Sequence, residues 1–190
     1  NRTFDAGSAT IESNYHELPA DINTVGLWHM NEASGNAADS SGNGNTGTPT
    51  GTTVVAGKLG NARSFNGSSS YVSVANSTTL NPTSAITVEG WFYMNSLPAS
   101  GSMTQIAGKS SSINGHAEYD LNVYNNAGSM QAYWRMYLSS NLTYYPLLIN
   151  YPFIASTWYH YAGTYDSATK QMKIYVNGVL TVWKLEQLPH

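Results

Sequence analysis

The chain has 190 residues, a formal charge of −3 and no cysteine, and only 10% of its residues are charged, against about 25% in a typical soluble domain. Its eight Lys and Arg residues are scattered singly, which argues against a nucleic-acid partner, and no run of about 18 apolar residues suggests insertion into a membrane. Without cysteine the chain cannot carry a disulfide scaffold or a thiolate metal site, and a surface rich in hydroxyls and amides but poor in charge favours a secreted or cell-surface protein.

Short strands are predicted along most of the chain. Residues 1–23 have no clear period and are expected to form an N-terminal arm or linker, which leads into a first strand over 25–30. Five further segments carry β-branched or aromatic residues at a period of two, with turn residues at their ends: 86–94, 119–124, 130–138, 158–165 and 172–176. No window sustains a helical period over three turns. The pattern predicts an all-β sandwich or jelly roll of antiparallel strands.

Two of the later turns and the faces of one strand are also predicted. Residues 166–171 are expected to join two strands as a hairpin, and Asn177-Gly178 tolerates the positive φ angles of a type I′ turn. Alternation over 86–94 predicts a core-facing set, Ile86, Val88, Gly90, Phe92 and Met94, and an outward-facing set, Thr87, Glu89, Trp91 and Tyr93.

Several short motifs occur in a characteristic order along the chain. They are Leu27-Trp28 with Glu32 and Gly35, the stretch 39–45, Phe65-Asn66-Gly67 with Tyr71-Val72, the stretch 87–91, Trp158-Tyr159-His160, Thr164-Tyr165-Asp166, and the stretch 175–179. In this order they closely resemble the laminin G-like domains of the concanavalin A-like lectin and glucanase superfamily, over about residues 24–180. The resemblance implies a two-sheet antiparallel jelly roll in a secreted or surface protein. Such modules bind glycans or extracellular proteins, often with calcium.

One departure from this family concerns the end of the chain. Members continue past the Val-Asn-Gly hairpin to a closing strand, whereas this chain ends at Leu185-Glu-Gln-Leu-Pro-His190. We therefore expect a laminin G-like domain over 24–190 that lacks the final closing strand. Either the chain is a fragment, or the exposed sheet edge is covered by the N-terminal arm or by a neighbouring molecule in an edge-mediated oligomer, since bare edges tend to pair.

A candidate calcium site lies in the stretch 39–45. Side-chain oxygens of Asp39, Ser41 and Asn43 occupy the first, third and fifth positions, and Asn45 follows Gly44 with a carbonyl. This spacing resembles the first half of a calcium loop, although Thr50 stands where a bidentate Glu would be. The alternative is an ordinary Asn/Gly turn in which Asp39 hydrogen-bonds the backbone.

A second candidate site lies on one sheet face. If residues 125–128 form a four-residue turn, Tyr124 pairs with Ser129, and two neighbouring strands present polar and aromatic side chains together. The predicted ligand-binding residues are Glu118, Asp120, Asn122, Tyr124, Gln131, Tyr133, Arg135 and Tyr137. Aromatic faces stack on sugars while planar polar groups bind their hydroxyls, so this face could bind a glycan. The alternative is a solvated face with a Glu118–Arg135 ion pair.

Hydrolysis is not expected on this face. The superfamily's retaining glucanases use three acids on one strand, but Glu118 and Asp120 are followed by Asn122 and Val123, so the acid that would protonate the leaving group is missing. We therefore predict a non-catalytic carbohydrate-binding or adhesion module. The alternative is a targeting appendage or fragment of a glycan-degrading enzyme.

The segment 144–153 holds four aromatic residues and two prolines. Proline in a strand marks an edge or a loop. Part of the segment is therefore expected to be a loop, which either walls a binding cleft or folds its rings onto the core.

Overall fold

The computed structural model describes residues 17–110, 117–138 and 143–185. Within these residues the chain is all-β, as predicted, with one short 3₁₀ helix, η1 (Thr78–Leu80). The strands are β1 (Gly47–Thr50), β2 (Thr53–Ala56), β3 (Asn61–Ser64), β4 (Tyr71–Val74), β5 (Ala85–Tyr93), β6 (Met103–Ser110), β7 (Ala117–Asn126), β8 (Ser129–Leu138), β9 (Thr143–Asn150), β10 (Trp158–Asp166), β11 (Gln171–Val176) and β12 (Val179–Leu185). No helix in this part of the chain is long and apolar enough to cross a membrane.

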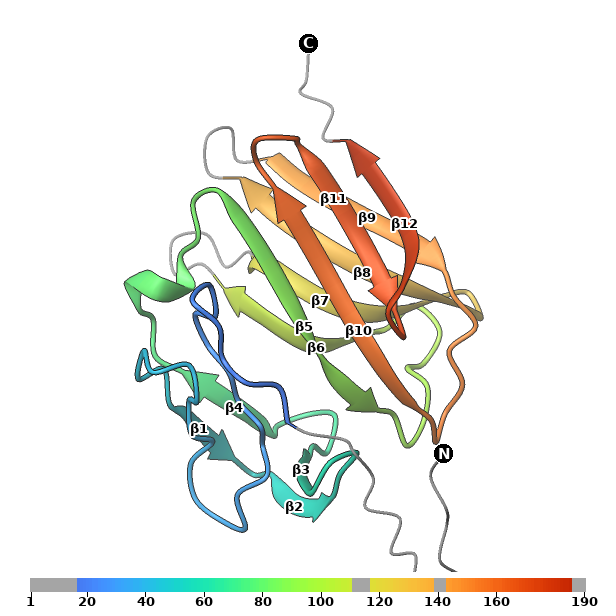
Figure 1. Cartoon of the computed structure of the whole chain (residues 1–190). Helices are drawn as coiled ribbons and strands as arrows, with labels where there is room; N and C mark the ends of the chain where they lie inside the picture. The colour runs from blue at the N-terminus through green and yellow to red at the C-terminus, as the bar shows by residue number, and fades with distance from the viewer. Residues whose placement is uncertain (1–16, 111–116, 139–142, 186–190) are drawn as a thin grey trace, which may run out of the picture. The chain divides into compact units, whose positions relative to one another are not determined.

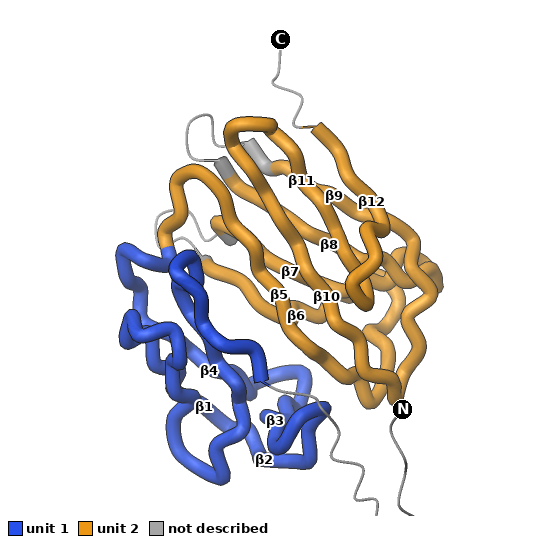
Figure 2. The backbone as a smooth tube through the Cα atoms, viewed as in Figure 1, with its two compact units in different colours: residues 1–80 blue, residues 81–190 orange. Residues whose placement is uncertain are grey.

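The chain divides into two compact units, residues 1–80 and 81–190 (Figure 2). The first unit holds two small sheets, β1-β4 and β2-β3. The second holds two four-stranded antiparallel sheets, with the orders β12-β11-β10-β5 and β6-β7-β8-β9. The boundary falls inside the predicted domain 24–190, and that assignment stays a prediction.

The predicted first strand over 25–30 is wrong. Only Trp28 forms a bridge there, to Asp39, and the rest of the segment is irregular. Met30 has a φ of 59°, in the left-handed region that a regular strand cannot contain. Trp28 is instead held by its indole Nε1, which donates to the Asn45 carbonyl at 2.6 Å.

The second unit is a two-layer sandwich (Figure 1). Phe92, Tyr161 and Ile174 from one sheet and Trp134 and Leu147 from the other are buried in one apolar cluster. A Cβ built on Gly163 of β10 would lie 2.4 Å from the Trp134 ring, so only glycine allows the two layers to approach this closely here. The Trp134 indole Nε1 also donates to the Thr164 carbonyl at 3.2 Å, which joins the sheets by a hydrogen bond.

The strands predicted over 86–94, 119–124, 130–138, 158–165 and 172–176 are confirmed within a few residues at their ends. Asp166 pairs with Gln171 as the 166–171 hairpin requires. Asn177 and Gly178 form a two-residue hairpin with φ angles of 51° and 77°, as a type I′ turn demands. In β5 the predicted inner set is buried or half-buried, and Thr87, Glu89, Trp91 and Tyr93 are exposed.

The expectation that part of the segment 144–153 is a loop is confirmed for residues 151–153. Most of the segment forms β9, an edge strand whose one partner among the described strands is β8. Pro146 is tolerated there because one side of an edge strand needs no hydrogen-bonded neighbour. The loop begins after Asn150, and Phe153 within it is buried in the core.

Candidate functional site

The predicted ligand-binding residues lie on one face of the β6–β9 sheet, the face opposite the sandwich core. We call this set, Glu118, Asp120, Asn122, Tyr124, Gln131, Tyr133, Arg135 and Tyr137, the polar face. The β7–β8 register pairs Asp120 with Arg135 and Asn122 with Tyr133. Neighbours along each strand point to opposite sides, and the intervening Leu121, Val123 and Trp134 are core residues.

The predicted register of this hairpin is wrong by two residues. The turn contains two residues, Ala127 and Gly128, instead of four, and Asn126 pairs with Ser129. Ala127 and Gly128 have φ angles of 52° and 97°, which a two-residue hairpin accommodates. Because the shift is even, no side chain changes face, and the composition of the polar face is as predicted.

The predicted Glu118–Arg135 ion pair is also wrong, because the register shift brings Asp120 opposite Arg135. The Arg135 Nε and Nη2 donate to the two carboxylate oxygens of Asp120. This pair is bidentate, and the Asp120 residue is only 1% exposed. Glu118 pairs instead with Lys109 of β6, with Oε2 3.1 Å from Nζ. Each acid of the polar face therefore has its own cation.

Asn122, at the centre of the polar face, is fully buried, and neither its Oδ1 nor its Nδ2 has a hydrogen-bond partner among the described residues. Its cross-strand neighbour Tyr133 contacts Tyr124, with 6.2 Å between ring centroids. The Arg135 guanidinium carbon lies 5.3 Å from the Tyr133 centroid. The Asn122 amide, which has unused hydrogen-bonding capacity, is thus the cross-strand neighbour of a half-buried tyrosine.

Gln131 is also buried and hydrogen-bonded. Its Nε2 donates to Asn150 Oδ1 of β9 at 2.8 Å, and the residue is 6% exposed. The accessible part of the polar face therefore consists of half-buried side chains, Glu118, Tyr124, Tyr133, Arg135 and Tyr137.

The candidate calcium residues share one turn of the first unit, the Asp39 loop (residues 39–45). The Oδ1 of Asp39 accepts from the backbone nitrogens of Leu27 at 3.0 Å and Ser41 at 2.9 Å. Its Oδ2 accepts from Ser41 Oγ and from the Asn45 nitrogen, both at 2.8 Å. Burial raises the pKa of Asp39, but these hydrogen bonds outweigh it and hold the pKa below its usual value.

In this arrangement the loop does not fit a calcium ion. A carboxylate has about four lone-pair sites, and four donors already occupy those of Asp39. The Asn45 Oδ1 accepts from Ser77 Oγ at 2.6 Å, and Asn43 directs its amide Nδ2 at backbone carbonyls. No group of three acidic, His or Cys side chains suited to a metal occurs among the described residues. Calcium binding here stays a prediction that requires the loop to rearrange.

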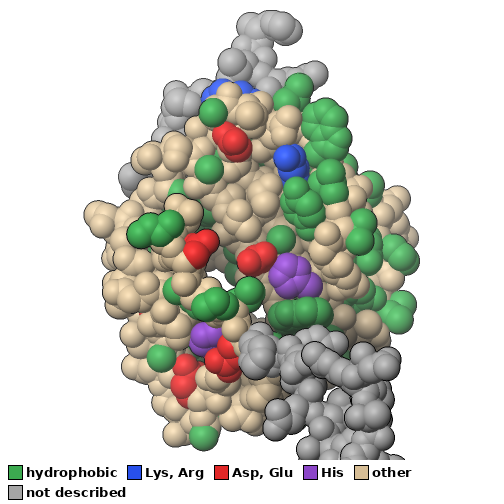
Figure 3. Space-filling view, viewed as in Figure 1, with side chains coloured by type: hydrophobic (Ala, Val, Ile, Leu, Met, Phe, Trp, Pro, Cys, Tyr) green, Lys and Arg blue, Asp and Glu red, His purple; other side chains and the backbone are tan. Residues whose placement is uncertain are grey.

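A second outward face was not singled out from the sequence. On the β12-β11-β10-β5 sheet, Trp91, Tyr93, Trp158, Tyr175, Leu180 and Trp183 form what we call the aromatic face. Trp183 is 54% exposed and Trp91 is 45% exposed. The rings of Tyr93 and Trp158 lie 5.5 Å apart. Figure 3 shows hydrophobic side chains gathered on this side of the molecule, over β11 and β12. The sequence signal for the aromatic face is the outward-facing set of the period-two pattern over 86–94, which includes Trp91 and Tyr93.

Comparison with known proteins gives a family-model match. The model is a laminin G model described as the concanavalin A-like lectin/glucanases superfamily, and it matches residues 66–182, well over half of the chain. No curated protein matches the chain.

Proposed function

The chain belongs to the concanavalin A-like lectin/glucanases superfamily, and from this premise we propose that it is a non-catalytic module that binds carbohydrate through its polar face. Membership of the superfamily supports a carbohydrate-binding or adhesion module in general. The assignment to the polar face, and to a secreted or surface-attached protein, is our proposal.

The observation that carries the proposal is the buried Asn122 amide, which has no hydrogen-bond partner among the described residues and lies opposite Tyr133 in the β7–β8 register. A buried polar group without a partner costs about 1–3 kcal/mol, and a sugar hydroxyl both donates and accepts hydrogen bonds. A ring movement that admits a sugar would let its hydroxyls pair with this amide. The Tyr133 ring and the Arg135 guanidinium would then contact the sugar from the side.

The test is a glycan array, followed by calorimetry on any glycan that binds. We expect Tyr133→Ala to weaken binding at least tenfold, and Tyr71→Ala, at an exposed tyrosine of β4, to leave it unchanged. Equal affinities of the wild type and Tyr133→Ala would contradict the proposal. Repeating the glycan-binding measurement in the presence of a calcium chelator shows whether calcium takes part in binding.

The ion pairs of Glu118 and Asp120 argue against the alternative that this chain cleaves glycans. Asp120 is held by Arg135 and Glu118 by Lys109, and Asn122 stands where a further acid would be needed on the same face. We propose that the chain does not cleave glycans itself, although it could serve as the targeting appendage of a catalytic domain. Release of reducing sugar from β-glucans by the purified chain would overturn this.

The aromatic face favours a second candidate function, adhesion to a protein. Exposed patches of large apolar side chains mark interaction surfaces, and Trp and Tyr dominate protein interfaces. Because β12 is also the edge strand of its sheet among the described strands, the simplest partner is a second copy of the chain. Analytical ultracentrifugation of the wild type and Trp183→Glu would test this. A monomeric wild type at high concentration would exclude self-association.

A further inference from the structure

The sequence contains Asn-Gly pairs that begin at Asn43, Asn66, Asn114 and Asn177, and the pair at Asn114 lies outside the described residues. An asparagine can lose its side-chain amide when the backbone nitrogen of the next residue attacks its Cγ. Glycine permits this attack because it has no Cβ to block the approach. Since every pair has the same local chemistry, only the folded structure can make one of them react faster than the others.

Asn66 is exposed and begins a turn of the first unit, which we call the Asn66 turn (residues 66–70). The backbone nitrogens of Ser68, Ser69 and Ser70 all donate to the Asn66 Oδ1, at 3.0, 2.9 and 3.1 Å. The hydroxyls of Ser68 and Ser70 donate to the same oxygen at 3.3 and 3.1 Å. Three backbone and two hydroxyl donors therefore converge on one amide oxygen.

These donors exceed what a neutral amide oxygen can use. The carbonyl oxygen of an asparagine has two lone pairs, whereas attack on Cγ would give this oxygen a full negative charge in a tetrahedral intermediate. Donors that are already fixed where such a charge develops lower the barrier, because they bind the intermediate more strongly than the starting amide. The Asn66 turn places donors in this way around its own side chain.

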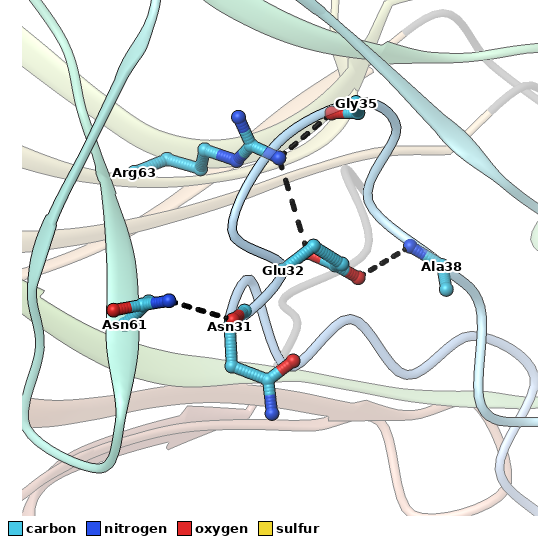
Figure 4. A network of polar contacts seen from close by, with 6 residues as sticks. All are labelled: Asn31, Glu32, Gly35, Ala38, Asn61 and Arg63. Carbon is cyan, nitrogen blue, oxygen red and sulfur yellow. Dashed lines mark hydrogen bonds and ion pairs between the residues drawn. The ribbon is translucent and has the colours of Figure 1, made fainter.

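The other two described Asn-Gly pairs have no comparable set of donors within the described chain. The Asn177 Oδ1 accepts from the His160 nitrogen at 3.0 Å. Asn43 directs its Nδ2 at backbone carbonyls. Asn61 of the first unit likewise uses its amide as a donor, from Nδ2 to the Asn31 carbonyl at 3.0 Å (Figure 4).

We infer that Asn66 is a site of spontaneous deamidation that the donors of its own turn promote. Hydroxide takes the N–H proton of Gly67, and the Gly67 nitrogen bonds to the Asn66 Cγ to close a cyclic imide. The Cγ–Nδ2 bond breaks, and the departing nitrogen takes a proton from water and leaves as ammonia. Water then opens the imide to aspartate or isoaspartate, so the chain exchanges ammonia for water and gains one negative charge.

The Asn66 turn also suits the product of this reaction. A carboxylate has about four lone-pair sites, so an aspartate at position 66 can accept from the same donors. The inference goes beyond the proposed function and does not depend on it, because the polar face and the aromatic face belong to the second unit.

The test is to incubate the full chain in mildly alkaline, heavy-oxygen water and to measure the conversion of each asparagine by peptide mass spectrometry. In the folded chain we expect Asn66 to convert about tenfold faster than Asn43 and Asn177, because its additional hydrogen bonds stabilise the intermediate. In urea the three rates should converge, because the donors are lost. An Asn66 rate that does not exceed both others in the folded chain, or that rises in urea, would overturn the inference.

Serine variants test the donors themselves. The double variant Ser68→Ala/Ser70→Ala removes two hydroxyl donors and leaves the three backbone donors, so we expect Asn66 to convert about fivefold more slowly. The matched control is Ser73→Ala, because the Ser73 hydroxyl donates to the Thr48 carbonyl outside the turn, and it should leave the rate unchanged. Ser68→Ala alone, which removes one hydroxyl donor, should also slow the reaction and serves if the double variant does not fold. Wild-type rates in the folded serine variants would overturn the inference.

Discussion

The two outward faces of the sandwich invert the usual relation between polarity and exposure. On the polar face, Asp120 and Asn122 are almost completely buried, whereas on the aromatic face Trp183 is 54% exposed. Buried polar groups and exposed apolar patches are the informative departures from ordinary protein surfaces. The comparison shows that the same alternation of side chains along a strand can produce one face held by ion pairs and another that exposes large aromatic rings.

The largest effect is expected from Asp120→Ala. The variant removes the buried carboxylate that binds the Arg135 guanidinium, and loss of one partner of a buried pair typically costs about 3–5 kcal/mol of unfolding free energy. Urea unfolding followed by fluorescence measures this. Glu118→Ala, which breaks the more exposed pair with Lys109, is the matched control and should cost at most about 1 kcal/mol. Similar losses in both variants would mean that the polar face is solvated as a whole.

Gly163→Ala tests how closely the two sheets pack in the core that separates the two outward faces. The added Cβ would meet the Trp134 ring at 2.4 Å, and overpacking of this kind costs about 1–3 kcal/mol. Gly90→Ala is the control, because a Cβ at that position in the adjacent strand β5 meets nothing within 4 Å. If both variants unfold at the same urea concentration, the sheets do not pack as closely as Trp134 and Gly163 indicate.

Asp39 provides the opposite case to Asn122, a polar group with all of its lone pairs used. Asp39→Ala should lower the unfolding free energy by about 1–2 kcal/mol at pH 7, through the loss of hydrogen bonds to a charged acceptor. Because the folded-state pKa is depressed, this contribution is present above the unfolded-state pKa and is lost as the pH falls through the folded-state value. The wild type and the variant should therefore converge in strongly acidic solution.

Calorimetry of calcium titrated into the wild type and into Asp39→Ala tests the prediction of a calcium site. Heat that appears with the wild type and disappears with Asp39→Ala would support a calcium site at the Asp39 loop. Equal heats from both would remove Asp39 from any such site.

The smallest effect is expected from Asn122→Leu. Because neither polar atom of Asn122 has a partner among the described residues, replacing the amide with an apolar side chain should leave stability unchanged or raise it by up to about 1 kcal/mol. Thermal unfolding measures this, and glycan binding should weaken in the same variant. A clear loss of stability would show that the amide is already paired in solution.

Much of the second unit could be predicted because its signals are local. The period of two in β5, β7, β8, β10 and β11 identifies the strands and their inner faces, and Asn177-Gly178 identifies a turn from the φ angles that its residues tolerate. The same reasoning failed at residues 25–30, which form only the isolated Trp28–Asp39 bridge and end in a positive φ at Met30. Residues 125–128 contain several turn-forming side chains, so the length of that turn was ambiguous.

The sequence by itself determined the all-β class, the family and the composition of the polar face. The order of the motifs indicates the family, and the period of two indicates the strands and their faces. A register shift of two residues in the β7–β8 hairpin leaves every side chain on the same face. Only the tertiary structure decided which charges pair, that Asn122 is buried with no hydrogen-bond partner for its amide among the described residues, and that four donors already occupy the Asp39 carboxylate. These properties depend on register and on neighbours distant in the chain. A local pattern specifies which way a side chain points, but not what it meets there.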